Sequence, residues 1–333
     1  MQKLGVGIIG CGLIGKKRAQ SLPDSVRLFG CMDKDLTRAE QLAQQYSDCV
    51  AWDDAEAMVR HPDIDIVILA TPLDVTAQLI MQAVKLGKHV LVEKPAARNA
   101  AELETILELL PKTDVCVRVG FNHRYHPAIL KACEMARAGE LGELMFVRGR
   151  YGHGGRVGYD KEWRANPVLS GGGELIDQGV HLIDLARVIL GDFVDVQGFA
   201  KTFYWDMPVD DNGFMLLKTA AQQVAFLHVS CTEWKNLFCL EIYGKNGKLQ
   251  IDGLGGSYGT ERLSYYKMLP EMGPPETTIW EYPGGDQSWR LEFLDFLKDI
   301  EQKRQPSASL YDAHAALTIV DTICKESGYD YCA

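Results

Sequence analysis

Several features that mark other protein classes are missing from this sequence of 333 residues. Its nine cysteines form no Cys-x-x-Cys pair, so neither a zinc ribbon nor a disulfide framework is indicated and a reducing compartment is expected. No apolar segment approaches the roughly 18 residues of a membrane span, and the start MQKLGVGIIG lacks a signal-peptide pattern. We therefore expect a cytoplasmic protein, and no metal site is indicated.

An excess of positive charge is also missing. The formal net charge is -10, whereas a general nucleic-acid or anionic-membrane surface needs a concentrated basic face. The 47% hydrophobic content is ordinary for a soluble globular protein, but the chain exceeds the roughly 250 to 300 residues of a single core. Two domains and a small-molecule partner are therefore expected.

The chain from Lys3 to Asn122 alternates short apolar runs with helical patterns. Strands are predicted at residues 6–9, 27–32, 64–70, 89–92 and 115–119, and helices at 14–22, 36–46, 54–60, 75–86 and 100–110. Continuous Val, Ile and Leu runs between helices indicate a parallel sheet that is covered on both faces. This pattern predicts an N-terminal α/β domain over residues 1–122.

The pattern changes after Pro127. One helix is predicted at residues 128–138, strands at 144–151, 194–204, 213–218, 224–230, 238–243 and 248–251, and two closing helices at 287–303 and 310–325. The turn GKNG at Gly244 to Gly247 is typical of a hairpin, so a large, mainly antiparallel sheet is expected. We assign residues 123–333 to this second α/β domain and allow the C-terminal helix to pack back on the first.

The clearest local motif is Gly10-Cys11-Gly12-Leu13-Ile14-Gly15, which follows a predicted strand and opens a helix. Glycines permit a tight turn and close approach of the backbone, and a helix N-terminus favours a pyrophosphate. Asp33, at the end of the next strand, can bind ribose hydroxyls and would repel a 2'-phosphate, although Lys34 softens that preference. The motif predicts an NAD site, with NADP less favoured; a purely structural turn is the alternative.

A second motif, HVLVEKP, ends a predicted strand in Glu93, Lys94 and Pro95. In a doubly wound sheet the carboxyl ends of strands line the ligand crevice, so Lys94 is expected on the nicotinamide side. A surface ion pair of Glu93 is the plainer alternative. Pro95 favours the functional interpretation, because it holds Lys94 extended and permits a cis bond.

The third motif, GGGELIDQGVHLIDLARVIL, places ionisable groups in an apolar helical pattern that begins at Gly171. At 100° per residue Glu174, Asp177, His181 and Asp184 fall on one narrow stripe. Unpaired buried charges are costly, so the stripe predicts partners or a ligand. The alternative is that Asp177 and His181 form a buried pair that only ties the two domains together. Asp184 is expected to cap or tie a neighbouring segment. Glu174 has no assigned role.

Four stretches together resemble the Gfo/Idh/MocA oxidoreductases: Thr71-Pro72, AVKLGKHVLVEKPAA from Ala83, GFNHRYHP from Gly120, and GGGELIDQGVHLID from Gly171. The resemblance implies a Rossmann domain, a second domain with an open sheet, and a homodimer or homotetramer formed through that sheet. It also implies hydride transfer between a nicotinamide and a secondary alcohol of a sugar, cyclitol or sugar derivative. Leu73 and Thr76 depart from the Asn and His of many members.

The resemblance assigns the catalytic set to Lys94, Asp177 and His181. His181 would take the proton of the substrate hydroxyl, and Asp177 would orient or bias His181. Lys94 would hydrogen-bond the same oxygen and stabilise the developing alkoxide. Cofactor contacts are expected from Gly10, Gly12, Leu13, Ile14, Gly15, Asp33, Lys34, Thr71, Pro72, Glu93 and Lys94. Substrate contacts are expected from Lys94, Arg124, Tyr125, His153, Arg156, Trp163, Arg164, Asp177 and His181.

Three alternatives remain at this stage. If Arg156 and Arg164 both face the substrate, a phosphorylated, acidic or nucleotide-linked sugar is favoured over a neutral cyclitol. A redox-neutral enzyme of the same fold would use tightly bound NAD for transient oxidation and elimination. A non-catalytic sensor of NAD or sugar would keep the fold without the chemistry, which the presence of Lys94, Asp177 and His181 disfavours.

Overall fold

The computed structural model describes residues 3–329, and the chain forms two compact units. Unit 1 comprises Met1–Phe121 and Trp289–Ala315, and unit 2 comprises Asn122–Ser288 and Ala316–Ala333. The sequence placed residues 123–333 in the second domain, whereas the segment Trp289–Ala315 groups with unit 1. Unit 1 is therefore built from two separate stretches of the chain.

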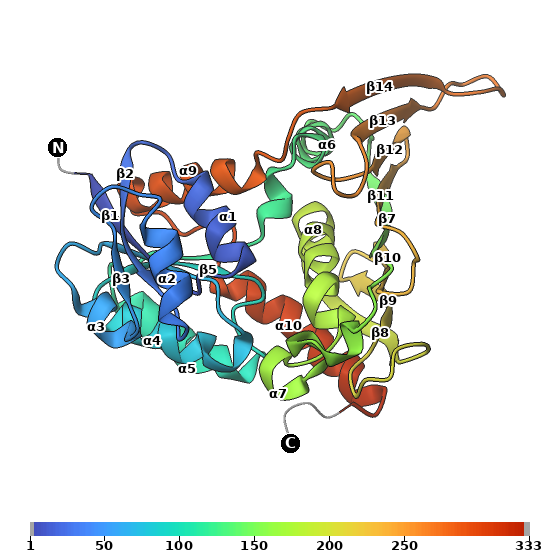
Figure 1. Ribbon diagram of the computed structural model, residues 1–333. Helices are drawn as coiled ribbons and strands as arrows, with labels where there is room; N and C mark the ends of the chain where they lie inside the picture. Colours follow the sequence, from blue (N-terminus) through green and yellow to red (C-terminus); the bar gives the residue numbers. More distant parts are fainter. Residues whose placement is uncertain (1–2, 330–333) are drawn as a thin grey trace. The chain divides into compact units, whose positions relative to one another are not determined.

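Unit 1 contains a six-stranded sheet in which all neighbouring strands are parallel (Figure 1). Its order is β3-β2-β1-β4-β5-β6, the order of a doubly wound dinucleotide-binding sheet. The strands are β1 (Leu4–Ile9), β2 (Val26–Met32), β3 (Val50–Trp52), β4 (Ile66–Leu69), β5 (His89–Glu93) and β6 (Val117–Gly120). The helices between them are α1 (Leu13–Ser21), α2 (Leu36–Ala43), α3 (Ala55–Arg60), α4 (Thr76–Lys85) and α5 (Ala101–Leu109). The predicted parallel sheet is confirmed.

One face of this sheet is covered by helices from both stretches of the chain. Small residues of α1 and α2, among them Ala19 and Ala39, pack with the strand side chains. Phe293 and Phe296 of α9 (Ser288–Gln302) join the same apolar cluster. The core of unit 1 therefore needs a helix that comes much later in the sequence.

Buried arginines also hold α9 to the sheet. Arg118 on β6 is fully buried; its guanidinium donates to Asp299, which is equally buried, and to Asp295 at 2.9 Å. Arg18 on α1 reaches Glu292 of α9 at 2.5 Å. An apolar cluster alone would leave the rotation of α9 loosely defined, whereas these pairs set which of its faces meets the sheet.

Unit 2 contains an eight-stranded sheet with the order β14-β13-β12-β11-β7-β10-β9-β8. Its strands are β7 (Leu144–Gly152), β8 (Phe193–Lys201), β9 (Asn212–Thr219), β10 (Val224–Ser230), β11 (Leu237–Gly244), β12 (Gly247–Asp252), β13 (Glu261–Lys267) and β14 (Glu276–Tyr282). Only β7 and β10 pair in parallel among these described strands, so the predicted mainly antiparallel sheet is confirmed.

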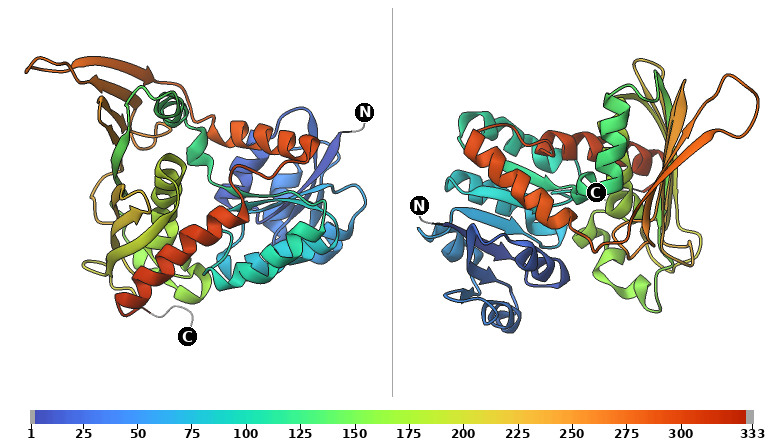
Figure 2. Two further views of the ribbon diagram at one scale, coloured as in Figure 1. Left: turned by 180° about the vertical axis from the view of Figure 1, so that it is seen from behind. Right: turned by 90° about the horizontal axis from the view of Figure 1, so that it is seen from above.

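The helices α6 (Pro127–Arg137) and α8 (Val180–Leu190) lie on one face of this sheet (Figure 2). The last part of α10 (Leu310–Glu326) meets β8, where Ile323 lies against Gly198. No helix among the described residues of unit 2 covers the opposite face. That face exposes Phe199, Leu216 and Phe226, which lie on the adjacent strands β8, β9 and β10.

Replacing Arg118 with Met should strongly destabilise the protein. The change leaves the buried Asp299 carboxylate without its buried counterion, and breaking such a pair costs about 3–5 kcal/mol. Calorimetry should show a clearly lower unfolding temperature. Arg304→Met is the matched control, because Arg304 binds the same two carboxylates from an exposed position and should have little effect. Equal effects of both variants would contradict the role assigned to burial.

Candidate active site

The glycine loop of unit 1 has the geometry expected of a phosphate-binding turn. Gly10 adopts a left-handed backbone with φ of 95°, and a Cβ there would lie 2.3 Å from the Ala70 carbonyl oxygen. A Cβ at Gly15 would lie 1.9 Å from the Gly10 oxygen, so α1 can approach β1 only with glycine present. A Cβ at Gly12 would meet nothing within 4 Å, so backbone at the α1 N-terminus is open to a ligand.

Asp33 directly follows β2 and is tied to the glycine loop. Its Oδ2 accepts from the Cys11 amide at 2.8 Å, and its Oδ1 accepts from the Asp35 amide at 3.0 Å. Each carboxylate oxygen keeps a further lone pair for a hydroxyl donor. Lys34 is exposed beside it, as are Leu13 and, in part, Ile14. These groups fit an adenosine ribose bound next to the loop.

The turn at Thr71 and Pro72, which precedes α4, is held by hydroxyl groups. The Thr71 and Thr76 hydroxyl oxygens lie 3.0 Å apart, and the Thr76 hydroxyl donates to the Pro72 carbonyl at 2.9 Å. Thr76 is one of the two positions, with Leu73, at which the sequence departs from many members of the resembled family. Its buried hydroxyl has a structural task here, since it fixes the turn that follows β4.

Lys94 follows the last residue of β5, and its peptide bond to Pro95 is cis. Glu93, expected among the cofactor contacts, accepts from the Arg18 Nε at 2.6 Å. Burial acts to lower the Arg18 pKa, but Glu93 and Glu292 more than reverse this, and the pKa is raised. Burial raises the Glu292 pKa, which Arg18 opposes. The ion pairs of Arg18 with Glu93 and Glu292 therefore hold the backbone next to Lys94 in place.

In unit 2 the glycine-rich entry is fixed by Asp210. Its carboxylate accepts from the Gly173 amide at 3.0 Å and from the Leu175 amide at 2.9 Å, while its carbonyl accepts from the Glu174 amide at 3.0 Å. A Cβ at Gly173 would lie 1.9 Å from the Asp210 carbonyl oxygen. Only glycine permits this close approach of the two backbones.

The helix that follows is not a regular α-helix throughout, so the projection at 100° per residue is wrong for its first part. Leu175–Gly179 forms a π-helical turn and α8 begins at Val180. Hydrogen bonds to the fifth residue admit one extra residue into the turn, and such turns are frequent at functional sites. The ionisable groups consequently meet partners from different elements instead of sharing one stripe.

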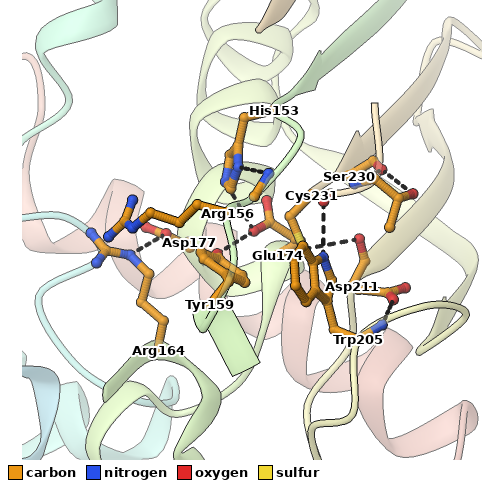
Figure 3. A network of polar contacts seen from close by, with 12 residues as sticks. His153, Arg156, Tyr159, Arg164, Glu174, Asp177, Trp205, Asp211, Ser230 and Cys231 are labelled. Atoms are coloured by element: carbon orange, nitrogen blue, oxygen red, sulfur yellow. Dashed lines mark hydrogen bonds and ion pairs between the residues drawn. The ribbon is translucent and has the colours of Figure 1, made fainter. Parts of the chain in front are cut away.

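Glu174, which had no assigned role, is the centre of a buried polar cluster (Figure 3). Its Oε1 accepts from the Tyr159 hydroxyl at 2.9 Å and lies 3.4 Å from the His153 Nε2. The His153 Nδ1 accepts from the Gly155 amide at 2.9 Å. Burial acts to lower the His153 pKa, but Glu174 and Asp177 raise it above its ordinary value overall. Burial raises the pKa of the Cys231 thiol, and the charge of Glu174 and a hydrogen bond to it raise that pKa further.

Asp177 is partly exposed and accepts from the Arg164 Nε at 3.1 Å (Figure 3). Burial acts to lower the Arg164 pKa, but the negative charge of Asp177 outweighs burial together with other groups, and the pKa is raised overall. The Arg164 guanidinium also stacks on Trp163, with its carbon 4.6 Å from the ring centroid. The positive charge of Arg164 is thus balanced by the carboxylate that the sequence assigned to catalysis.

His181 is buried and stacks on His123, with ring centroids 3.7 Å apart and planes 14° from parallel. Tyr151 meets both rings at their edges, with centroids 5.2 Å from His123 and 6.2 Å from His181. Burial raises the Tyr151 pKa well above its usual range, so this phenol stays protonated. His181 therefore lies in an aromatic setting that limits its ring to few orientations.

Arg124 and Arg156, two further residues predicted to bind substrate, each pair with a carboxylate of unit 2. Arg124 forms two hydrogen bonds to the buried Asp184, which confirms that Asp184 ties a neighbouring segment and places Arg124 in that tie. Tyr125 is buried. Arg156 pairs with Glu162 at 2.7 Å and is largely exposed. Each of the three candidate arginines of unit 2 therefore has a carboxylate partner.

Sequence reasoning did not single out His123, Tyr159 or Asp210. His123 stands within GFNHRYHP, beside the chosen Arg124, so its motif was visible while its contact with His181 was not. Tyr159 and Asp210 have no sequence signal, because their partners are distant in the chain. Across the described residues 3–329 no cluster of three or more ligating side chains is suited to a metal ion, and no helix is long and apolar enough to cross a membrane.

Comparison with known proteins agrees with this geometry. The family described as "Oxidoreductase family, NAD-binding Rossmann fold" matches residues 4–121, and the "GFO/IDH/MocA C-terminal domain" matches residues 129–250. The scyllo-inositol 2-dehydrogenase (NAD(+)) of Bacillus subtilis is 30% identical, covering 94% of this chain and 90% of that protein. The inositol 2-dehydrogenase of Rhizobium meliloti is 28% identical, and the match covers 95% of this chain and 94% of that protein.

Levoglucosan dehydrogenase of Pseudarthrobacter phenanthrenivorans is 27% identical over 66% of this chain and 59% of its own length. A solved structure of levoglucosan dehydrogenase in complex with NADH and levoglucosan has a TM-score of 0.88 at 22% identity, covering 98% of this chain and 97% of that one. This structural likeness shows the shared fold. With matches to both family domains and a relative that is 30% identical over nearly its whole length, the chain belongs to the Gfo/Idh/MocA family of NAD-binding oxidoreductases.

Proposed function

We propose that this protein is an NAD-dependent dehydrogenase that oxidises a secondary hydroxyl of a neutral sugar or cyclitol, or reduces the corresponding ketone. The observation that carries the proposal is His181, a buried imidazole held by His123 and Tyr151 on the helix that also carries Asp177. Alcohol oxidation needs a base that titrates near neutrality, and histidine is the side chain suited to it.

The glycine loop and Asp33 support NAD as the cofactor. The open backbone at Gly12 and the N-terminus of α1 suit a pyrophosphate, and the Asp33 carboxylate suits ribose hydroxyls while repelling a 2'-phosphate. Glu93, bound by Arg18, acts in this proposal by anchoring Lys94. When bound, NAD supplies a nicotinamide that exchanges hydride with the substrate carbon.

In the proposed reaction each residue of the catalytic set has a separate task. His181 removes the proton from the substrate hydroxyl, and Lys94 donates a hydrogen bond to the same oxygen as negative charge develops there. Asp177, held by Arg164, accepts a hydrogen bond from a second hydroxyl of the substrate and so orients the substrate. In the reverse direction His181 returns the proton to the oxygen.

The charge balance of unit 2 favours a neutral polyol over an anionic sugar. Arg124, Arg156 and Arg164 are paired with Asp184, Glu162 and Asp177, so a phosphate or carboxylate would have to displace a protein carboxylate. His153 and the buried Glu174 supply a donor and an acceptor of the kind that vicinal hydroxyls bind. Related inositol and levoglucosan dehydrogenases support the same class of substrate.

We also propose that two copies pair through the open face of the unit 2 sheet. Phe199, Leu216 and Phe226 are exposed there on adjacent strands, and contiguous apolar surface of this kind marks a protein interface. The same face carries a charged group in which Glu241 binds Arg148 and Lys248. Apolar and charged regions on one face can pair with themselves across a twofold axis.

Replacing His181 with Asn, or Lys94 with Met, should lower kcat about 10²–10⁴-fold, the usual contribution of a positioned acid or base. NADH formation at 340 nm should be followed with inositols, hexoses, sugar phosphates and uronates as substrates. NAD affinity, measured by calorimetry, should persist in both variants. His61→Asn, whose ring packs on Phe29 outside the site, is the control and should keep full activity. Near-normal turnover of His181→Asn would refute the assignment of the base.

Replacing Asp33 with Ser should shift cofactor preference toward NADP. Hydrogen bonds to a charged group contribute about 1.5–3 kcal/mol, so the ratio of kcat/KM for NAD over NADP should fall roughly 10- to 100-fold. Asp35→Ser is the matched control, since the Asp35 carboxylate caps α2 by accepting from the Thr37 amide. A preference that is unchanged in Asp33→Ser would show that the ribose is bound by other groups.

Replacing Glu174 with Gln should lower the pKa of His153 and raise the KM for the substrate. The negative charge of Glu174 favours the imidazolium form, so its removal leaves the opposing effect of burial dominant. The His153 pKa should be followed by NMR titration of its imidazole protons. Glu162→Gln, which neutralises the partner of Arg156, should leave that pKa nearly unchanged. A pKa that does not fall in Glu174→Gln would exclude the proposed pair.

A further inference from the structure

Three cysteines gather at the nucleotide-binding end of the unit 1 sheet. Cys11 lies within the glycine loop, Cys31 is the penultimate residue of β2, and Cys49 directly precedes β3. The sulfur atoms of Cys31 and Cys49 are 3.6 Å apart, and a hydrogen bond joins Cys31 to Cys11 as well. Sulfur atoms this close need to approach by only about 1.5 Å to reach the bonded distance of about 2.05 Å.

The two thiols in contact differ in reactivity. Cys49 is partly exposed, and its pKa is lowered because Cys31 and the Val50 amide donate to its sulfur, although burial opposes this. Cys31 is buried, and its hydrogen bonds to Cys11 and Cys49, together with burial, raise its pKa. Because Cys49 is partly exposed and Cys31 is buried beside it, Cys49 is the thiol that solvent oxidants reach first, and Cys31 is the neighbour able to resolve the product.

Cys49 lies at the end of a loop and on the same face of the sheet edge as Cys31. Cys49 ends the loop between α2 and β3, in which Asp48 adopts a left-handed backbone with φ of 59°. Cys31 pairs with Ala51 in the parallel register of β2 and β3, so Cys31 and Cys49 lie on the same face of the sheet edge. A bond between them would join the end of β2 to the start of β3.

The pair is connected to the cofactor-binding groups through short contacts. Cys31 is followed by Met32, whose carbonyl accepts from the Gly10 amide at 2.8 Å and from the Cys11 thiol at 3.4 Å. Asp33 comes next and accepts from the Cys11 amide. A displacement of the end of β2 consequently moves the glycine loop and Asp33 relative to each other.

We propose that Cys31 and Cys49 form a reversible intramolecular disulfide that weakens binding of the dinucleotide. The oxidant is a low-molecular-weight disulfide such as glutathione disulfide. The Cys49 thiolate attacks one of its sulfur atoms, forming a mixed disulfide and releasing one glutathione thiolate. Cys31 then loses its proton to solvent and attacks the Cys49 sulfur as a thiolate, and the second glutathione leaves with the bonding electron pair and takes up a proton. Two protein thiols are oxidised and one glutathione disulfide is reduced to two thiols.

The remaining described cysteines lack this combination of contact and access. Cys116, in the same unit, is buried and has its pKa raised to about 12, chiefly by burial. Cys133, Cys231, Cys239 and Cys324 are buried as well. Cys11 touches Cys31 but is itself fully buried, so an oxidant reaches it less readily than Cys49. The site is therefore defined by one partly exposed thiol and one buried partner.

The test treats the full-length protein with defined ratios of reduced to oxidised glutathione, quenches with acid, alkylates free thiols and maps disulfides by mass spectrometry. We expect a peptide pair joined through Cys31 and Cys49 that dithiothreitol separates. The affinity for NAD, measured by calorimetry on the same samples, should fall about two- to tenfold, the effect of losing one hydrogen bond, and recover on reduction.

Cys49→Ser and Cys31→Ser should abolish both the linked peptide and the change in affinity. Cys116→Ser is the matched control and should behave as the unaltered protein. Absence of the linked peptide, or a bond between Cys11 and Cys31 in its place, would overturn the proposal. A Cys31–Cys49 bond that leaves NAD affinity unchanged would overturn its coupling to the nucleotide site. None of these outcomes depends on which sugar the enzyme oxidises.

Discussion

The hydrogen bonds that Asp210 makes to the glycine-rich entry position the start of the segment that carries the candidate catalytic residues of unit 2. The carboxylate is buried and accepts hydrogen bonds from two backbone amides, those of Gly173 and Leu175, which would otherwise be unsatisfied at the start of the following helix. Two backbones can approach so closely only because residue 173 has no Cβ. Glu174, Asp177 and His181 then follow at fixed positions, because the π-helical turn and α8 continue from this anchor.

The charges of the site are arranged so that few are left unbalanced. Arg164 offsets the negative charge that Asp177 would otherwise place near His181, and Tyr159 and His153 surround the Glu174 carboxylate. Cys231 is a further neighbour of this carboxylate, because Glu174 raises the pKa of the Cys231 thiol through its charge and a hydrogen bond, in addition to the larger effect of burial.

Much of the fold could be predicted from the sequence, because apolar runs and their spacing identify buried strands and helices without reference to distant residues. The strand β3 was missed since Val50–Trp52 is too short for a pattern. The hairpin of β13 and β14 was missed as well, and ETTIWEY of β14 is mostly exposed. The return of α9 to unit 1 had no local signal. Glu292 and Asp299 read as solvent-facing charges on an amphipathic helix, and only the buried arginines on α1 and β6 show why they are buried.

The candidate site was less predictable for the same physical reason. Motifs identified residues whose identity is dictated by backbone geometry, such as Gly10 and Gly15, and residues repeated along one helix. They could not identify Asp210 or Tyr159, whose roles arise from contacts across the sequence. The π-helical turn was missed because a hydrophobic pattern assumes a constant angle per residue, and Asp210 sets the start of this helix from outside it. The partner of Asp177, which lies on this turn, therefore had to be found from the structure, where the Arg164 guanidinium donates to its carboxylate.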